Sequence, residues 1–171
     1  MQIISEKTDT EAYRALVERL AETNSPEVFS NGRAEHAAII YETFLKFAKT
    51  RVRILCRNLS RQVFQKPLIE RMEMALLNGV KIDIITQEAA ESTDLIDASK
   101  LWIGRKFPIQ ILQAKPATKA ATMLENFATM DGRAYRFESD HENHTAHACF
   151  FNTSLTKQLD DVFLRFQAGL I

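Results

Sequence analysis

The stretch Asn78-Gly79-Val80-Lys81-Ile82-Asp83-Ile84-Ile85-Thr86 decides the fold class of this chain. Pro67 stands where the first turn of a helix would be, and apolar residues recur at helical spacing between it and Asn78. Asn-Gly ends this helix, because both residues tolerate a positive φ. The mostly apolar residues 80–86 are then predicted to form a strand.

A second strand is predicted just before this unit, at Arg51–Cys56, where basic and apolar residues alternate before the run becomes fully apolar. A strand, a helix, a glycine turn and another strand at this length predict a right-handed crossover between parallel strands. The sequence therefore predicts an α/β fold.

Further elements are predicted on both sides of this unit. Apolar periodicity predicts helices at 10–21, from about 30 to 48, and at 93–105, and a last helix that Thr153 or Ser154 caps. Strands are predicted at 108–112, 127–130, 134–138 and 146–152, with Asp131-Gly132 as a hairpin turn and 139–144 as a polar loop. Together these elements predict a mixed, mostly parallel sheet with helices on both faces.

Composition limits the class of protein. With 171 residues, 46% of them hydrophobic, the chain is long enough for one domain with a core. Lysine plus arginine total 22 and aspartate plus glutamate total 22. This balance argues against a protein that coats nucleic acid by bulk electrostatics, and it favours self-association.

Location is predicted from cysteine content and from hydropathy. Cys56 and Cys149 both lie in apolar runs and are expected to be buried, reduced thiols. The first residues lack the apolar core of a signal peptide, and no segment has the length needed to span a bilayer. We therefore expect a cytoplasmic protein without a membrane partner.

The order of these elements resembles the phospholipase D superfamily. In that family a helix ends in a Gly-Val-x-Val/Ile turn and strand, matched here by Gly79-Val80-Lys81-Ile82. A third strand, the signature His-x-Lys-(x)4-Asp, a Gly-Ser-x-Asn-like strand and a C-terminal helix follow. The resemblance is one of order and pattern, and it implies a phospholipase D-like half-domain over 29–171 after a helical extension over 1–28.

The catalytic signature of the family is degenerate in this sequence. Asp131 matches its aspartate, which places Asn126 at the lysine position and Leu124 at the histidine position. Asn152 matches the asparagine of the Gly-Ser-x-Asn strand. The family's histidine attacks phosphorus and its lysine neutralises the phosphoryl oxygens. Leucine can do neither, and asparagine at best donates a neutral hydrogen bond.

The resemblance therefore implies an inactive domain that acts in binding or regulation. Its ligand would bear phosphate, as nucleic acid or a nucleotide does, and no cofactor is expected. Active members of this family that carry a single signature form homodimers, so the resemblance implies a homodimer here as well. A structural partner of another protein is a further alternative.

Displaced histidines offer another alternative, an active phosphodiesterase or nuclease. His141, His144 and His147 follow one another at intervals of three, and imidazole is a common zinc ligand. A polar loop that happens to contain histidines is the favoured interpretation, because this spacing is not that of a fixed family motif. His147 is predicted to lie in a strand, on the same side as Cys149.

Arginines supply the candidate ligand-binding residues. Arg51, Arg53, Arg57 and Arg61 form a basic cluster, and residues 57–61 occupy the carboxyl end of a predicted strand, where ligands of open α/β sheets bind. If strand alternation holds, Arg51 and Arg53, and with them Arg57, share one side or rim of the sheet. The cluster is expected to bind an anion or a nucleic-acid phosphate, or else to pair with glutamates of adjacent helices. Arg136 is a further phosphate candidate, with a solvated strand surface as its alternative.

Overall fold

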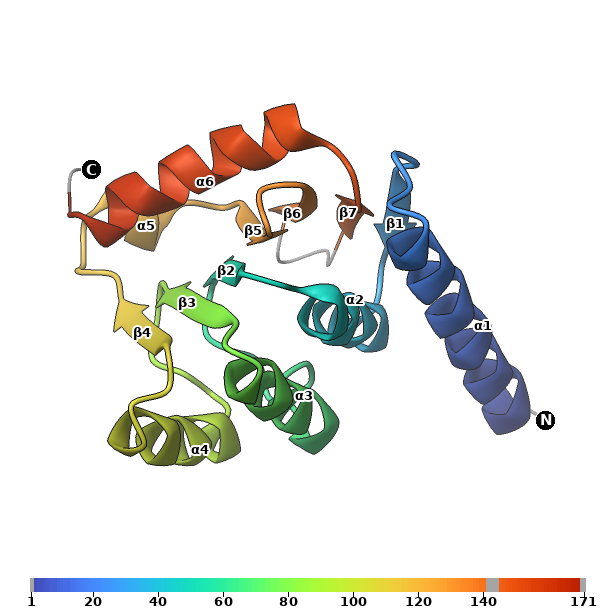
Figure 1. Ribbon diagram of the computed structural model, residues 1–171, viewed down its shortest axis with the longest axis horizontal. Helices are drawn as coiled ribbons and strands as arrows, with labels where there is room; N and C mark the ends of the chain where they lie inside the picture. The colour runs from blue at the N-terminus through green and yellow to red at the C-terminus, as the bar shows by residue number, and fades with distance from the viewer. Residues whose placement is uncertain (1, 141–144, 170–171) are drawn as a thin grey trace.

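A seven-stranded sheet runs through the middle of the molecule in the computed structural model, which describes residues 2–140 and 145–169 (Figure 1). Across the sheet the strand order is β1-β7-β6-β5-β2-β3-β4. The strands are β1 (Phe29–Asn31), β2 (Arg51–Cys56), β3 (Lys81–Thr86), β4 (Ile109–Gln113), β5 (Asn126–Met130), β6 (Ala134–Asp140) and β7 (Thr145–Cys149). The helices are α1 (Gln2–Glu22), α2 (Ala34–Phe47), α3 (Lys66–Leu77), α4 (Thr93–Gly104), α5 (Lys119–Thr122) and α6 (Thr153–Gln167).

Helices cover both faces of the sheet, as the sequence predicts. In Figure 1, α2, α3 and α4 lie below the sheet and α6 lies above it. Alternation along β2 sends Val52 and Ile54 into the larger core and Leu55 into a smaller core beneath α6. Two hydrophobic clusters, one on each face, therefore hold the layers together.

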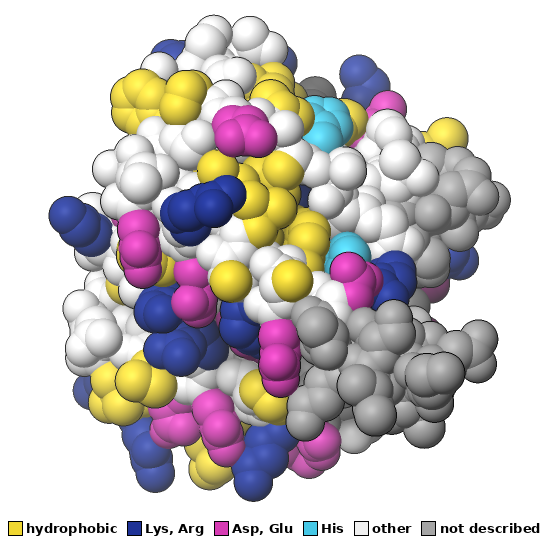
Figure 2. All heavy atoms as spheres, turned by 90° about the vertical axis from the view of Figure 1, so that its right-hand side faces the viewer, with side chains coloured by type: hydrophobic (Ala, Val, Ile, Leu, Met, Phe, Trp, Pro, Cys, Tyr) yellow, Lys and Arg dark blue, Asp and Glu magenta, His cyan; other side chains and the backbone are white. Residues whose placement is uncertain are grey.

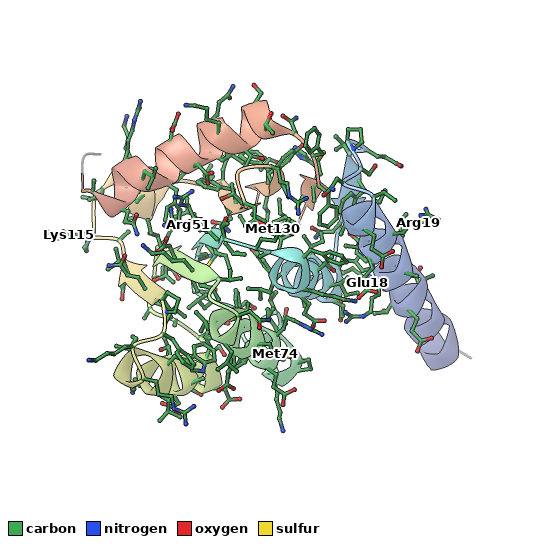
Figure 3. The ribbon with its side chains drawn as sticks, viewed as in Figure 1. Glu18, Arg19, Arg51, Met74, Lys115 and Met130 are labelled. Carbon is green, nitrogen blue, oxygen red and sulfur yellow. The ribbon has the colours of Figure 1, made fainter. Side chains whose placement is uncertain are left out.

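The α1 helix packs along α2 and adds Val17 and Leu20 to the larger core. Figure 3 shows Glu18 on the side of α1 that faces α2, where it pairs with Lys46 at 3.2 Å, and Arg19 on the outer side. No helix among the described residues is both long enough and apolar enough to cross a bilayer.

The unit from β2 to β3 confirms the predicted crossover. The two strands pair in parallel with Arg51 opposite Lys81, and α3 connects them. Gly79, with φ +83°, follows Asn78 at the end of α3. The glycine can occupy this left-handed conformation without a steric cost.

The sheet is mixed, but the prediction that it is mostly parallel is wrong for its strand pairs. Among the described strands, only β2–β3 and β3–β4 pair in parallel, and the other four neighbouring pairs are antiparallel. After β4 the chain changes from crossovers to hairpins. A hairpin such as the one at Asp131-Gly132 joins antiparallel strands with a few residues, whereas parallel strands need a long crossover.

Element boundaries differ from prediction at four places. The edge strand β1 occupies residues predicted to begin the second helix, which instead starts at Ala34. The short α5 was not predicted, since four residues are too few to show helical periodicity. The helix α1 begins well before residue 10, and β6 extends to Asp140.

The last strand also ends earlier than predicted, because Asn152 is the cap of α6. Its Oδ1 accepts a hydrogen bond from the Leu155 N–H at 3.0 Å. Thr153 and Ser154, the predicted caps, belong to the helix itself. Asparagine is among the strongest capping residues, so the local chemistry favours this position.

Both cysteines are buried and unpaired, as predicted. Cys56 lies at the end of β2, where burial raises the pKa of its thiol to about 12. The thiol is therefore protonated at neutral pH and is a poor nucleophile.

Two glycines with open surroundings test the role of backbone conformation. A Cβ at Gly79 or at Gly104 would meet no atom within 4 Å, but only Gly79 has a positive φ. We expect Gly79→Ala to lower the free energy of unfolding by about 1 kcal/mol. Gly104→Ala, at the end of α4, should raise it by a few tenths, at most about 1 kcal/mol. Urea denaturation measures both, and equal effects of the two substitutions would contradict this account.

Candidate functional site

Strand register brings four side chains into one row at the carboxyl end of β2. Asn31 of β1 lies opposite Ala146 of β7, which lies opposite Glu138 of β6, which lies opposite Asn126 of β5. All four point to the side of the sheet that α2 covers. On this side of the sheet, next to the row, is a pocket of about 360 Å³. It is lined by Asn31, Arg33, Ala34, Ala37, Tyr41, residues 56–64, Glu91, Asn126, Arg136 and Glu138.

A buried ion pair forms the floor of the pocket. Arg136 is 3% exposed, and its Nη2 donates to the Glu138 carboxylate at 2.8 Å. Its Nε donates to the Asn31 Oδ1 at 3.1 Å, and its Nη1 donates to the Tyr41 hydroxyl at 3.3 Å. The alternative prediction, that Arg136 is solvated at a strand surface, is therefore wrong.

Small side chains on the two neighbouring strands leave space for the Arg136 side chain. In register, Arg136 lies between Ala128 of β5 and Ala148 of β7, and both methyl side chains are fully buried. Burial alone would lower the pKa of Arg136, but Tyr41 and Glu138 outweigh it and raise the pKa above its ordinary value. The guanidinium therefore stays charged inside the protein.

Asn126 completes the floor. Its Nδ2 donates to the second carboxylate oxygen of Glu138 at 3.3 Å. The side chain is 5% exposed, and its Oδ1 has no hydrogen-bond partner among the described residues. Asn126 is thus tied to the ion pair through its Nδ2, while its Oδ1 is buried in the pocket floor without a partner among the described residues.

The rim is built by two loops that are joined backbone to backbone. The amides of Glu88, Glu91 and Ser92 donate to carbonyls of residues 57–59 over 2.7–3.1 Å. Leu59 holds a left-handed conformation with φ +50° while its side chain is fully buried. Such a backbone is strained for leucine and is kept only where surrounding contacts enforce it.

The predicted cluster of four arginines is split between two places. Arg57 and Arg61 lie on the rim of the pocket, and Arg57 pairs with Glu88 at 3.0 Å. Arg51 and Arg53 instead point to the α6 side of the sheet. Figure 3 shows Arg51 there, 3.6 Å from Asp83, and Arg53 pairs with Asp160 of α6 at 3.0 Å. Arg51 and Arg53 therefore share one side of the sheet, as strand alternation predicts. Arg57 does not join them, because β2 ends at Cys56 and strand alternation ends with it.

Asp131 lies at the other end of β5, away from the pocket. Its carboxylate accepts hydrogen bonds from the backbone amides of Lys49, Thr50 and Arg51 at 2.8–2.9 Å and from the Thr50 hydroxyl at 2.9 Å. Burial by itself would raise the pKa of this carboxyl group, but these hydrogen bonds together lower it. Asp131 therefore anchors the β5–β6 turn to the start of β2.

Asn152 is also at this far end, where its backbone N–H donates to the backbone carbonyl of Arg133 at 2.7 Å. The four residues of the degenerate signature are thus not gathered in one site. Asn126 alone reaches the pocket. Leu124 is 65% exposed and does not line it.

Of the three candidate histidines, His141 and His144 lie outside the described residues. His147 is on the α6 side of β7, as predicted, with its ring 5.5 Å from that of Tyr135 and 5.6 Å from that of Phe137. It therefore faces away from the pocket. Among the residues that the structure describes, no three His, Cys, Asp or Glu side chains could hold a metal ion together.

Sequence reasoning missed three residues of the pocket floor, namely Asn31, Tyr41 and Glu138. Glu138 lies two positions from Arg136 on a predicted strand, so alternation alone places them on one face. Asn31 carries no such signal, because its three-residue strand is too short to show a pattern. Tyr41 appears only as one apolar position of a helix.

Neither a protein-family model nor a curated protein matches the chain in sequence. Solved structures match it in three dimensions. The phospholipase D family member Nuc from Salmonella typhimurium has a TM-score of 0.57 at 14% identity, covering 84% of this chain and 95% of that one. NucT from Helicobacter pylori has a TM-score of 0.58 at 14% identity, covering 83% and 94%. This chain has a phospholipase D-like fold.

A third similar structure is that of TrmBL2, an archaeal chromatin protein with a novel mode of DNA binding. Its TM-score is 0.63 at 13% identity. The match covers 98% of this phospholipase D-like chain and therefore includes most of α1, but the chain spans only 62% of the chromatin protein's length.

The anchoring role of Asp131 gives a pH-dependent prediction. We expect Asp131→Asn to lower the free energy of unfolding by about 1–2 kcal/mol at pH 7, because asparagine keeps the turn but loses charge-assisted hydrogen bonds. Since the folded-state pKa lies below the unfolded one, this stabilisation is present above about pH 4 and disappears as the pH falls through the folded-state value. Urea denaturation from pH 7 down to pH 3 measures the difference.

Asp161→Asn is the matched control for this experiment. Asp161 is exposed on α6 and pairs with Lys157, so its substitution should change stability by less than about 0.5 kcal/mol. A difference between wild type and Asp131→Asn that stayed constant from pH 7 to pH 3 would show that the carboxylate is not the stabilising group.

Proposed function

We propose that this phospholipase D-like domain binds a phosphate-bearing ligand in the pocket at the carboxyl end of β2 and does not cleave it. One observation carries the proposal. Of the four arginines that line the pocket, Arg136 pairs with Glu138, Arg57 with Glu88 and Arg33 with Asp9, and only for Arg61 is no ion pair found within the described residues. In the cavity at the other end of the sheet both arginines pair with aspartates.

Arg61 is the residue best placed to meet a phosphate. Its backbone amide donates to Glu91, while no ion pair of its side chain is found within the described part of the chain. Arg57 lies next to it on the same rim and shares its charge with Glu88. A planar guanidinium presents two parallel N–H groups that match phosphate oxygens.

The pocket lacks the means for phosphodiester cleavage. Within the described residues its lining contains no histidine and no lysine. Burial raises the pKa of Cys56 and of Tyr41 to about 12, so neither is an activated nucleophile at neutral pH. The Glu138 carboxylate already accepts hydrogen bonds from Arg136 and Asn126. These features support binding of a ligand in the pocket rather than its cleavage.

The similar structures favour nucleic acid or a nucleotide as the source of the phosphate. The archaeal chromatin protein TrmBL2 binds DNA, and its match extends over nearly the whole of this chain. A binding domain without catalysis suits a regulatory role. Figure 2 views the molecule from the side of α1. Where the structure describes the side chains of this face, positive and negative groups are interspersed and do not form a basic stripe for a polyanion.

Four expectations from the sequence stay predictions. These are the homodimer, a protein partner, the cytoplasmic location, and a boundary between an N-terminal helical extension at 1–28 and the core. Light scattering after size exclusion measures the first of them directly.

Binding of inorganic phosphate tests the proposed site. We expect titration calorimetry to show binding that weakens as the salt concentration rises, because surface ion pairs are screened. Arg61→Gln should weaken it about tenfold, the loss of one charge-assisted contact. Arg165→Gln removes an exposed arginine of α6 on the other side of the sheet and should leave it unchanged. Equal losses in both variants, or no binding at all, would overturn the proposal.

Hydrolysis of bis(p-nitrophenyl) phosphate tests whether the domain is inactive. We expect no release of nitrophenol above the buffer rate, with or without EDTA, because the pocket lacks an activated nucleophile. Turnover that His147→Ala abolishes would instead establish the alternative of an active phosphodiesterase with displaced histidines.

A further inference from the structure

The floor of the pocket holds two buried polar atoms that have no partner among the described residues. They are the Nδ2 of Asn31 and the Oδ1 of Asn126. Asn31 is 4% exposed and Asn126 is 5% exposed, and both line the pocket. Buried polar atoms are nearly always hydrogen-bonded, so each such exception requires an explanation.

The orientation of both amides is determined by their neighbours. The Arg136 Nε can only donate, so the Asn31 atom beside it must be the oxygen, and the NH₂ group turns away. The Glu138 carboxylate can only accept, so the Asn126 atom beside it must be the NH₂ group, which leaves the oxygen unpaired. One donor and one acceptor therefore remain unpaired beneath the surface of the pocket floor, one on each side of the Arg136–Glu138 ion pair.

These two groups do not suit a bare phosphate. The dianionic phosphate group of an ester accepts hydrogen bonds and has nothing to donate to the Asn126 carbonyl. Inorganic phosphate has an O–H to donate, but either anion would lie near the carboxylate of Glu138. A hydroxyl or an amide both donates and accepts, and it carries no charge. The rim, with Arg57 and Arg61, is where a phosphate fits.

We propose that the ligand is a small phosphate ester with uncharged hydroxyl or amide groups, its phosphate at Arg57 and Arg61 and its uncharged part held by Asn31 and Asn126. This inference rests on the proposed function and narrows its ligand from any phosphate-bearing molecule to one of sugar-phosphate or mononucleotide size. The pocket volume of about 360 Å³ is at the lower end of the range for small-molecule sites, about 300–1,000 Å³. A polymer would need an extended basic groove instead.

Ribose 5-phosphate is a suitable probe, with inorganic phosphate and free ribose as its two halves. We expect calorimetry to show ribose 5-phosphate binding at least about tenfold more tightly than inorganic phosphate at equal ionic strength, the effect of one or two additional buried hydrogen bonds. Ribose 5-phosphate should also displace a short oligothymidylate, if that binds.

Substitutions at Asn31 test which atoms account for the tighter binding of ribose 5-phosphate relative to inorganic phosphate. Asn31→Asp keeps an oxygen for Arg136 and replaces the donor by an acceptor, and Asn31→Leu removes the donor without adding charge. Both should reduce the affinity for ribose 5-phosphate to that for inorganic phosphate. Ser30→Asp adds the same charge one residue away, at an exposed position on the other face of β1, and should have no effect. Thermal melting verifies that each variant is folded.

The outcomes separate this inference from the function on which it rests. If inorganic phosphate binds through Arg61 and ribose 5-phosphate binds no better, the inference is wrong and the proposed function stands. The same holds if oligothymidylate binds and ribose 5-phosphate does not displace it, because the ligand is then a nucleic acid. The preference for ribose 5-phosphate over inorganic phosphate could disappear in Asn31→Asp but not in Asn31→Leu. That result would show that the added charge, and not the lost donor, weakens binding, and it would overturn the inference. If nothing binds, both are wrong.

Discussion

The guanidinium of Arg136 is the group on which the arrangement of the pocket depends. An isolated charge inside a protein is costly, and it persists only where other groups compensate it. Here Glu138 supplies the opposite charge, while Asn31 and Tyr41 accept the remaining hydrogen bonds. These partners come from β1, α2 and β6, so one ion pair holds three elements in register around the pocket. Alanines on the neighbouring strands leave the space that it occupies.

The same sheet carries a second set of buried charges at its opposite end, with a different consequence. Arg53 pairs with Asp160 of α6, and the Asp131 carboxylate receives backbone amides from the start of β2. In that cavity positive and negative groups are equal in number, and the contacts join α6 and a hairpin turn to the sheet. At the carboxyl end of β2, by contrast, Arg61 lines the pocket with no ion pair found within the described residues. We interpret the charges at the far end as structural and the pocket at the carboxyl end as the site for an anion, in line with the position of ligands in open α/β sheets.

Asn126 stands at the position that the resemblance to the phospholipase D superfamily implies for a lysine, and its contacts give the amide a structural role. A lysine beside Glu138 would make a second ion pair, and it would lack the carbonyl oxygen that is now unpaired in the pocket floor. The neutral amide donates to Glu138 without competing with Arg136 for its charge. Under the function proposed above, the same amide helps to recognise the molecule that is attached to a phosphate.

The sequence by itself determined the α/β class, the crossover from β2 to β3, the helices on both faces and most strand positions. Apolar periodicity and turn residues are local, so they can be seen along the chain. It also placed Asn126 and Arg136 among the residues of interest. Only the tertiary structure decided that Arg51 and Arg53 point away from Arg57 and Arg61, that Asp131 and Asn152 anchor the far end of the sheet, and that Asn31, Tyr41 and Glu138 surround Arg136. The reason is that partners such as Asn31 and Arg136 are brought together by strand order, which local patterns along the chain do not encode.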